Sequence, residues 1–436
     1  MNLKDLDVTG KTVLLRVDYN VALENGKVVE PKRIEATIPT LRYLLERNAK
    51  VVILSHLGRP KGRDPKFSLK PVVQSLAKIA KDKRLPSIGC SLWEGNFASE
   101  ELARRVRALK PREILLLENL RFDSGEEKNY LSFAKALARL GDCFVQEAFG
   151  ALHRAHASTD GLPRLLPSAC GLLVQKELEV LGTLLKNPSK PFIAILGGLK
   201  VSDKIAAIEN LLNNGIDRVL IGGALAYTWL RAQGHQTGDS PVEKDWVDKV
   251  KVLLQNPQYK NRIVLRQDHW IVPSGTTHGA VQQAVLCLAK PGHGARLTAH
   301  ENIPSGWEGV DIGPKTLELF QSEIAKAKTI LWNGPVGLIE VAPFDRGSVE
   351  LAKTISRRTK EGALTVLGGG DTIYAVSKAG LSESDFTHVS TGGGATLEFL
   401  EGKSLPGVAA IQPEFCVQNS PEGANGIGTL GQFHSG

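Results

Sequence analysis

The feature that most constrains the fold is a regular alternation of short apolar runs with amphipathic stretches. The runs are rich in β-branched residues, as expected of strands that are buried on both faces of a sheet. The candidate strands are Thr12–Val17, Val51–Leu54, Ile114–Leu117, Cys143–Val145, Phe192–Leu196, Arg218–Ile221, Arg262–Leu265, Thr329–Trp332, Leu364–Leu367 and His388–Ser390. Helical patterns lie between them, for example over Thr37–Glu46 and Tyr130–Arg139. This alternation predicts an α/β protein with parallel sheets that are covered by helices on both sides.

The alternation pauses once, at a predicted helix over Leu172–Leu185. Its apolar residues Val174, Leu178 and Leu181 fall on one face, and Asn187-Pro188 ends it before a new strand begins. We therefore predict a first domain over residues 1–171, a connecting helix over 172–186 and a second domain over 187–399. Two such domains would form a cleft, since open α/β sheets bind ligands at the carboxyl ends of their strands.

Composition excludes several classes of protein. The chain has 436 residues with 42% hydrophobic and 23% charged residues, which is typical of a globular protein. The net charge of 54 − 46 = +8 is small for this length, so a dedicated nucleic-acid binder is disfavoured. The five cysteines are widely spaced and odd in number, which argues against a disulfide framework. The chain has no signal-peptide pattern and no long apolar stretch, so we expect a cytoplasmic protein without a membrane partner.

The stretch from Gln412 to Gly436 differs from the rest of the chain. It has no Lys or Arg and little periodicity, so we predict a flexible tail. Gly426–Gly431 matches the spacing GxGxxG, but no strand precedes it and no helix follows it. We therefore do not interpret it as a dinucleotide-binding loop.

Several strands of the second domain end in glycine-rich or polar loops. The strongest candidate is Gly368–Thr372, where glycines between a strand and a helix would let a phosphate approach backbone N–H groups. Asp371 in this loop is a hard oxygen ligand suited to Mg²⁺, or it simply caps the helix. Gly197–Lys204 and Thr391–Gly394 follow other strands in the same way, and Trp332–Glu340 is a tight polar loop. Lys200 and Lys204 would share a helix face, where they could reach a phosphate or remain solvated.

The strands of the first domain end in basic residues. These segments are Arg16–Asn20, His56–Gly62, Glu118–Phe122 and His153–His156. Because arginine forks suit carboxylate and phosphate oxygens, converging Arg and His side chains suggest a site for a small polyanion. For any single arginine, a surface salt bridge is the simpler interpretation.

Taken in order, these segments closely resemble the phosphoglycerate kinase family from about residue 1 to Ile411. The matching segments are RVDYN, SHLGRPKG, ENLRF, AFGALHRAHAS, GGLKVSDKI, WEGVDIGPKT, WNGPVG, GGGDT and STGGGATLEFLEGKSLPGV. One such segment would be a weak signal, whereas a collinear series is highly specific. The resemblance implies two Rossmann-like parallel-sheet domains joined by a helix, with a cleft between them. It also implies a glycolytic phosphotransferase that moves a phosphoryl group from 1,3-bisphosphoglycerate to ADP by hinge closure.

The resemblance also implies roles for individual residues. Those expected to bind the phosphoglycerate are Asp18, Asn20, Arg33, His56, Leu57, Gly58, Arg59, Arg121 and Arg154. Those expected to bind ADP or ATP are Gly198, Lys200, Lys204, Gly222, Gly309, Asn333, Pro335, Glu340, Gly369, Gly370, Asp371 and Thr372. Arg33, Lys200, Gly370 and Gly393 are expected to be catalytic, and Asp371 to hold Mg²⁺. A monomer is expected, with the segment at about 400–411 packing back on the first domain.

The chain departs from the family pattern at a few places. Tyr19 and Ala22 replace Phe and Pro, and Gln146-Glu147 replaces Asn-Asp. Leu199 stands where Ala is usual, Ala224 where a third glycine is common, and Arg266–Asp268 lacks the usual Leu-Pro-Val approach to Asp. Leu199 and Ala224 are expected beside the nucleotide, where they would alter its affinity.

Two alternatives remain: a divergent member with impaired catalysis that acts in binding or regulation, and a basic nucleic-acid-binding protein. Arg33, Lys200 and Asp371 argue against the first, and the lack of an aromatic-interleaved basic stripe argues against the second.

Overall fold

The computed structural model describes residues 1–275, 294–298 and 301–411. Its contacts divide the chain into two compact units. The first unit comprises Met1–Glu179 and the C-terminal stretch that begins at Gly402, and the second comprises Val180–Glu401. Helix α7 (Leu172–Lys186) begins in the first unit and ends in the second. The tail predicted from Gln412 onward lies outside the described residues.

The first unit is built on a six-stranded sheet with the order β5-β6-β4-β1-β7-β8, in which every pair is parallel. Its strands are β1 (Thr12–Arg16), β4 (Lys50–Leu54), β5 (Gly89–Trp93), β6 (Glu113–Leu117), β7 (Cys143–Gln146) and β8 (Ser168–Cys170). Its helices are α1 (Lys32–Glu35), α2 (Ile38–Glu46), α3 (Lys70–Asp82), α4 (Glu100–Arg107), α5 (Ser124–Glu127) and α6 (Leu131–Ala138). A short hairpin of β2 (Leu23–Glu24) and β3 (Lys27–Val28) precedes α1.

Alternation along β1 separates two hydrophobic cores. Val13 and Leu15 pack with Leu41 of α2 and Leu76 of α3 on one face of the sheet. Leu14 points to the other face and packs with residues that include α4 and α6 side chains. Because both faces are buried, β1 is apolar from Val13 to Leu15, and Arg16, its last residue, is also buried.

The C-terminal stretch of the first unit contacts its loops directly. Helix α16 (Pro406–Ala409) lies against the segment that follows β7, where the Gly407 amide donates a hydrogen bond to the Leu152 carbonyl (3.0 Å). A Cβ on Gly407 would lie 2.6 Å from the Leu152 side chain, so this close approach requires glycine.

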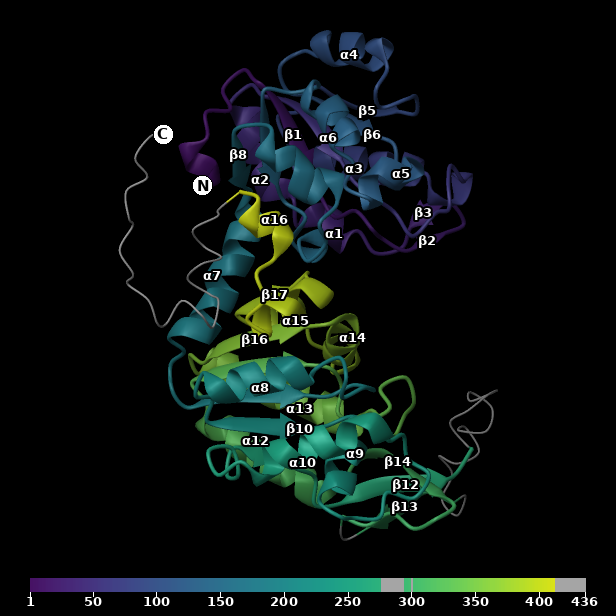
Figure 1. The fold of residues 1–436 in the computed structure, drawn as a ribbon, viewed down its shortest axis with the longest axis vertical. Helices are drawn as coiled ribbons and strands as arrows, with labels where there is room; N and C mark the ends of the chain where they lie inside the picture. The colour runs from purple at the N-terminus through teal and green to yellow at the C-terminus, as the bar shows by residue number, and fades with distance from the viewer. Residues whose placement is uncertain (276–293, 299–300, 412–436) are drawn as a thin grey trace, which may run out of the picture. The chain divides into compact units, whose positions relative to one another are not determined.

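The second unit contains another parallel sheet, of which β10, β16 and β17 are labelled in Figure 1. Its strand order is β11-β10-β9-β15-β16-β17. Its strands are β9 (Phe192–Leu196), β10 (Arg218–Ile221), β11 (Ile263–Val264), β15 (Thr329–Asn333), β16 (Leu364–Gly368) and β17 (His388–Ser390). Its helices are α8 (Ile205–Asn213), α9 (Ala226–Ala232), α10 (Val247–Gln255), α12 (Pro314–Lys326), α13 (Arg346–Lys360), α14 (Gly370–Lys378) and α15 (Gly394–Leu400). The two parallel sheets confirm the predicted α/β class.

A second, three-stranded antiparallel sheet was not predicted from the sequence. It consists of β12 (His269–Pro273) between β13 (Arg296–Thr298) and β14 (Trp307–Ile312). It lies beside α9 (Figure 1). Ile271 of β12 packs against Tyr227 and Leu230 of that helix. Among the described residues, none of the helices has the length and apolar character needed to cross a membrane.

Candidate functional site

The carboxyl ends of four neighbouring strands carry the polar loops of the second unit. In the register of the sheet, Asn333 at the end of β15 pairs with Leu196 of β9 on one side and Gly368 of β16 on the other. The loops that begin at Gly197, Gly222, Gly334 and Gly369 therefore leave the sheet at the same edge. This edge is where open α/β sheets bind their ligands.

Two glycines allow these loops to approach one another closely. A Cβ at Gly197 would lie 2.0 Å from the Pro335 carbonyl oxygen. Gly223 has a φ of +62°, and a Cβ there would lie 2.2 Å from the Gly198 nitrogen. Backbone hydrogen bonds complete the contact, since the Gly198 amide donates to the Pro335 carbonyl (2.9 Å). The loops after β9, β10 and β15 thus form one wall.

Lys204 lies behind this wall. Its buried ammonium donates hydrogen bonds to the Gly197 carbonyl (2.6 Å) and to both the carbonyl and side-chain oxygens of Asn333 (2.8 and 2.7 Å). Burial lowers the pKa of Lys204 to about 8. The other lysine of this segment, Lys200, is exposed. Lys204 therefore holds the loops together, whereas Lys200 extends into solvent.

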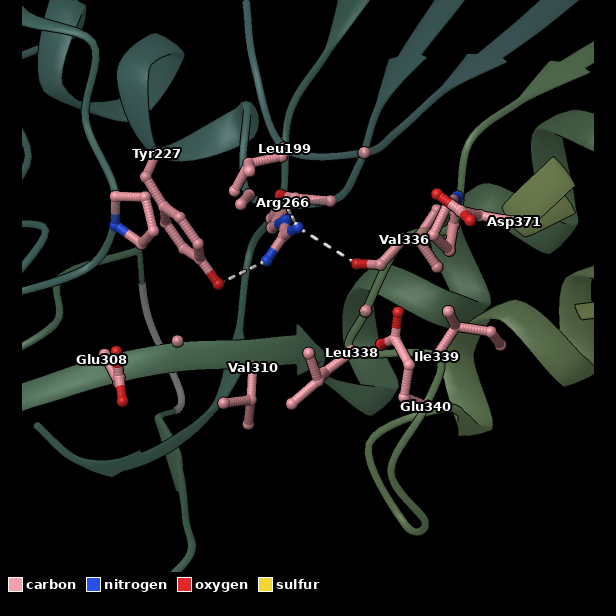
Figure 2. Close-up of a pocket in the computed structure, with 17 residues that line it drawn as sticks. Leu199, Tyr227, Arg266, Glu308, Val310, Val336, Leu338, Ile339, Glu340 and Asp371 are labelled. Atoms are coloured by element: carbon pink, nitrogen blue, oxygen red, sulfur yellow. Dashed lines mark hydrogen bonds between the residues drawn. The ribbon is translucent and has the colours of Figure 1, made fainter. Parts of the chain in front are cut away.

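A cavity of about 420 Å³ lies in front of the wall (Figure 2). Five of the predicted nucleotide-binding residues line it: Gly198, Gly309, Pro335, Glu340 and Asp371. The other seven predicted nucleotide-binding residues do not line it: Lys200, Lys204, Gly222, Asn333, Gly369, Gly370 and Thr372. Of its other lining residues, Leu199 and Ala224 were expected beside the nucleotide, and the rest were not predicted as site residues: Gly223, Tyr227, Pro241, Arg266, Glu308, Val310, Val336, Gly337, Leu338 and Ile339. Most of these are apolar, which suits a flat ring such as a nucleobase.

Helix α14 begins at this cavity. Gly369 precedes it with a φ of +93°, a conformation that favours glycine. The Thr372 hydroxyl donates to the Gly368 carbonyl (2.8 Å) and accepts from the Gly334 amide (2.7 Å), which joins the helix to the loop after β15. Asp371 in the first turn is exposed and lines the cavity. Gly393, with a φ of +53°, precedes the shorter helix α15 in the same manner.

The first unit carries the basic residues predicted from the sequence. Arg33 forms an ion pair with Asp18. The Asn20 side-chain oxygen accepts from the Gly58 amide (2.8 Å), and Arg121 donates to the Gly58 carbonyl (2.5 Å). The segment after β4, with His56, Leu57 and Gly58, is thus held by partners from two other strand ends, whereas Arg59 remains exposed.

Burial and the nearby arginines together keep the histidines of this region neutral. Burial is the main cause that lowers the pKa of His56 well below its usual range, and Arg16, Arg121 and Arg154 lower it further. Burial and the same arginines lower the pKa of His156 to about 4. These histidines are therefore neutral at pH 7. The positive charge of the site comes from Arg16, Arg121 and Arg154, the arginine cluster of the first unit, and it suits a multiply charged anion.

Arg16 belongs to the segment Arg16–Asn20 that was predicted to contribute to the polyanion site, although it was not assigned a role of its own. Its Nε donates to the Ser158 hydroxyl (2.7 Å), one of its Nη atoms lies 3.2 Å from His56 Nδ1, and it lies 3.9 Å from the Glu126 carboxylate. A charged residue that ends a buried strand was the available signal. Its partners could not be found from the sequence, because Ser158 is 142 positions away.

Comparison with known proteins identifies the family. The family model described as phosphoglycerate kinase matches residues 3–403. The chain belongs to the phosphoglycerate kinase family. The family, the phosphotransferase class and the role in glycolytic phosphoryl transfer predicted from the sequence are thereby confirmed.

Relatives and solved structures agree with this assignment. Phosphoglycerate kinase from Thermus thermophilus is 47% identical over 416 residues, covering 94% of this chain and 99% of the relative. The enzyme from Fervidobacterium nodosum is 45% identical over 415 residues, covering 94% and 98%. The structure of phosphoglycerate kinase from Coxiella burnetii superposes with a TM-score of 0.80 at 35% identity, covering 95% of this chain and 99% of that one. The two-domain kinase fold therefore extends over nearly the whole chain.

Proposed function

We propose that the first unit binds 3-phosphoglycerate or 1,3-bisphosphoglycerate and that the second unit binds ADP or ATP with Mg²⁺. The observation that supports this division is the 420 Å³ cavity at the carboxyl edge of the second sheet. Its glycine loops, its apolar lining and the adjacent start of α14 match the needs of a nucleotide base and its phosphates. The arginine cluster of the first unit matches the carboxylate and phosphate of the other substrate.

Asp371 is the residue proposed to hold Mg²⁺. In the described part of the chain, no three His, Cys, Asp or Glu side chains lie together in a way that could hold a metal ion. Mg²⁺ commonly uses only one or two carboxylates and takes its other ligands from substrate phosphates and water. An exposed carboxylate at the edge of a nucleotide cavity fits that pattern. When bound, Mg²⁺ would neutralise charge on the phosphates of the nucleotide.

The transfer itself requires positioning and charge neutralisation. An oxygen of the terminal ADP phosphate attacks the phosphorus of the acyl phosphate, and the bond to the carboxyl oxygen breaks to leave 3-phosphoglycerate as a carboxylate. We assign Arg33 and Lys200 to the equatorial oxygens of the group in transfer. Gly370 and Gly393, before or within the first turns of α14 and α15, would offer backbone N–H groups to developing charge.

We also propose that the two units approach each other when both substrates are bound. Closure would exclude water, which would otherwise hydrolyse the acyl phosphate. The polypeptide crosses between the units in α7 and again near Gly402, so these segments are the proposed hinges. The active species is proposed to be a monomer.

The decisive experiment is a coupled assay of ATP formation from 1,3-bisphosphoglycerate and ADP, with and without Mg²⁺. Turnover that depends on Mg²⁺ supports the proposal. Binding of both substrates without turnover would instead support the alternative of a member with impaired catalysis.

A further inference from the structure

One charged residue in the wall of the nucleotide cavity has no counterpart in the expected family pattern. Arg266 follows β11 and stands where the Leu-Pro-Val approach to Asp268 is usual. Its side chain is only 2% exposed, yet it contributes to the lining of the cavity. Burial of a guanidinium is costly unless its surroundings compensate for the lost water. The partners of Arg266 therefore indicate its purpose.

Those partners come from two loops and a helix. One Nη atom donates to the carbonyls of Gly223 and Val336, the latter at 3.1 Å. The other Nη atom donates to the Tyr227 hydroxyl (2.8 Å), and the guanidinium carbon lies 4.8 Å from the centre of the Tyr227 ring. Figure 2 shows the guanidinium between Tyr227 and Val336, bridging the two sides.

The bridged loops are the ones that shape the cavity. The Val336 carbonyl also accepts from the Gly223 amide (3.1 Å), so Gly223 and Arg266 share one acceptor. Gly223, Val336 and Tyr227 all line the cavity, and they come from the loop after β10, the loop after β15 and helix α9. A single side chain thus fixes the relative positions of three lining segments.

The charge of Arg266 adds a second effect. Its hydrogen-bond partners among the described residues are two carbonyls and a hydroxyl, and it also interacts electrostatically with the buried Asp311 carboxyl, whose pKa burial raises to about 7. The part of its charge that Asp311 does not offset attracts an anion that enters the adjacent cavity, because the local dielectric is low. A nucleoside diphosphate is such an anion.

We propose that Arg266 is a positioning residue for the nucleotide: it holds the loops of Gly223 and Val336 at the separation that admits a nucleoside diphosphate. It acts through these loops and not by contact with the reacting atoms. This inference rests on the proposed nucleotide site of the second unit.

The test compares Arg266→Met and Arg266→Lys with the wild type and with Arg262→Met as a control. Arg262 immediately precedes β11 and donates to the Leu212 carbonyl (2.9 Å), but it does not line the cavity. The measurements are the Kd for Mg²⁺-ADP by calorimetry, the KM values for ADP and 1,3-bisphosphoglycerate, and the thermal unfolding temperature. All binding is measured well below that temperature, so that loss of fold does not contribute.

We expect Arg266→Met to raise the Kd and KM for the nucleotide roughly tenfold, since charge-assisted hydrogen bonds are lost, while the KM for the other substrate changes less than about twofold. Arg266→Lys should lie between Met and the wild type, because it keeps the charge but loses the fork. Arg262→Met should bind the nucleotide as the wild type does. If Arg266→Met proves unfolded, Arg266→Lys and Tyr227→Phe replace it in the test. Tyr227→Phe removes one hydrogen-bond partner of Arg266, and both variants should raise the Kd and KM for the nucleotide by a smaller factor.

Two results would overturn the inference, and they differ in meaning. If the wild type binds Mg²⁺-ADP and every folded Arg266 and Tyr227 variant binds it equally well, Arg266 is only structural and the proposed function stands. If the wild type does not bind Mg²⁺-ADP, the proposed nucleotide site fails and this inference fails with it.

Discussion

The ammonium of Lys204 donates hydrogen bonds to both the backbone carbonyl and the side-chain oxygen of Asn333, at 2.8 and 2.7 Å. Asn333 ends β15, whereas Lys204 immediately precedes α8, which follows β9. The contact therefore joins the loops of two adjacent strands from behind. Lys200, only four positions earlier, is exposed. The two lysines of one segment should consequently respond differently to the same substitution.

Lys204→Met should lower both thermal stability and turnover. It removes the lysine donor from three buried oxygens, of which the Asn333 carbonyl still accepts from the Gly197 amide (3.0 Å). Each oxygen left without a donor costs about 1–3 kcal/mol, and the loops proposed to bind phosphate loosen. Lys200→Met should lower turnover roughly a hundredfold with an unchanged unfolding temperature, because its side chain is exposed and its proposed role is in the transition state. Thermal unfolding and steady-state kinetics on both variants provide the check. Equal unfolding temperatures for the two variants would contradict the structural role of Lys204.

Arg33→Ala should fold normally and lose most of its turnover. Its guanidinium is paired with Asp18 in the free protein, and both side chains are partly exposed, so the ion pair adds little stability. Loss of a charge-assisted donor to the transferring phosphoryl group costs roughly 10²–10³ in kcat. The matched control is Arg42→Ala, which removes a half-buried arginine that donates to the Lys83 and Arg84 carbonyls. Near-normal kcat in Arg33→Ala would exclude it from the catalytic role.

Asp371→Ala should weaken the binding of Mg²⁺-nucleotide and leave the binding of 3-phosphoglycerate almost unchanged. The reason is that Asp371 lines the cavity of the second unit, while the arginine cluster belongs to the first. Separate calorimetric titrations of the two ligands measure this, with Asp248→Ala on the exposed side of α10 as the control. An equal loss of affinity for both ligands would show that the division of labour is wrong.

Closure predicts a smaller radius of gyration for the ternary complex than for the free protein. A ligand shifts a conformational equilibrium only if it interacts differently with the two states, and here each substrate supplies one half of the contacts. Small-angle scattering on the free, singly liganded and ternary states tests the proposal. Identical radii for the free and ternary states would eliminate hinge closure.

Strand positions could be predicted from the sequence because strands buried on both faces are continuous apolar runs. Phe192–Leu196 and Arg218–Ile221 agree in both bounds with β9 and β10. Strand β5 was missed, since Gly89–Trp93 is largely half-buried and includes Gly, Cys and Ser. Strands β12 and β14 were missed for a related reason. Their sequences contain His269, Glu308 and Asp311, so neither strand is a continuous apolar run.

The site was predictable where its signal is local. Gly198 and Gly369, at the start of their loops, have a positive φ that favours glycine. Such a glycine directly after a strand can be recognised from a few neighbouring residues. Arg266 and Tyr227 were missed because their roles depend on partners elsewhere in the chain. Arg266 meets Tyr227 across 39 positions and Val336 across 70. No pattern in a short window contains that information.

Glu147 links acidity to the start of α7. The Thr40 hydroxyl donates to this buried carboxylate, and the Leu173 amide, in the first turn of α7, lies 3.2 Å from both of its oxygens. A Cβ at Gly171 would lie 2.1 Å from the carboxylate, so the helix entry is tightly packed. Burial raises the pKa of Glu147 from 4.5 to about 7, in spite of these hydrogen bonds.

The raised pKa predicts that Glu147 makes the protein less stable as the pH increases. Between pH 4.5 and about 7 the folded carboxyl keeps its proton while the unfolded one loses it, so the free energy of unfolding falls across this window. The full difference corresponds to about 3 kcal/mol, since one pKa unit is about 1.4 kcal/mol. Glu147→Gln cannot titrate and should lack this decline, while Glu46→Gln, exposed at the end of α2, should keep it. Urea unfolding of the three proteins at pH 5 and pH 8 measures the effect as a difference, in which the other titrating groups cancel. Equal pH dependence in Glu147→Gln and the wild type would show that Glu147 is already ionised in the folded protein throughout this range.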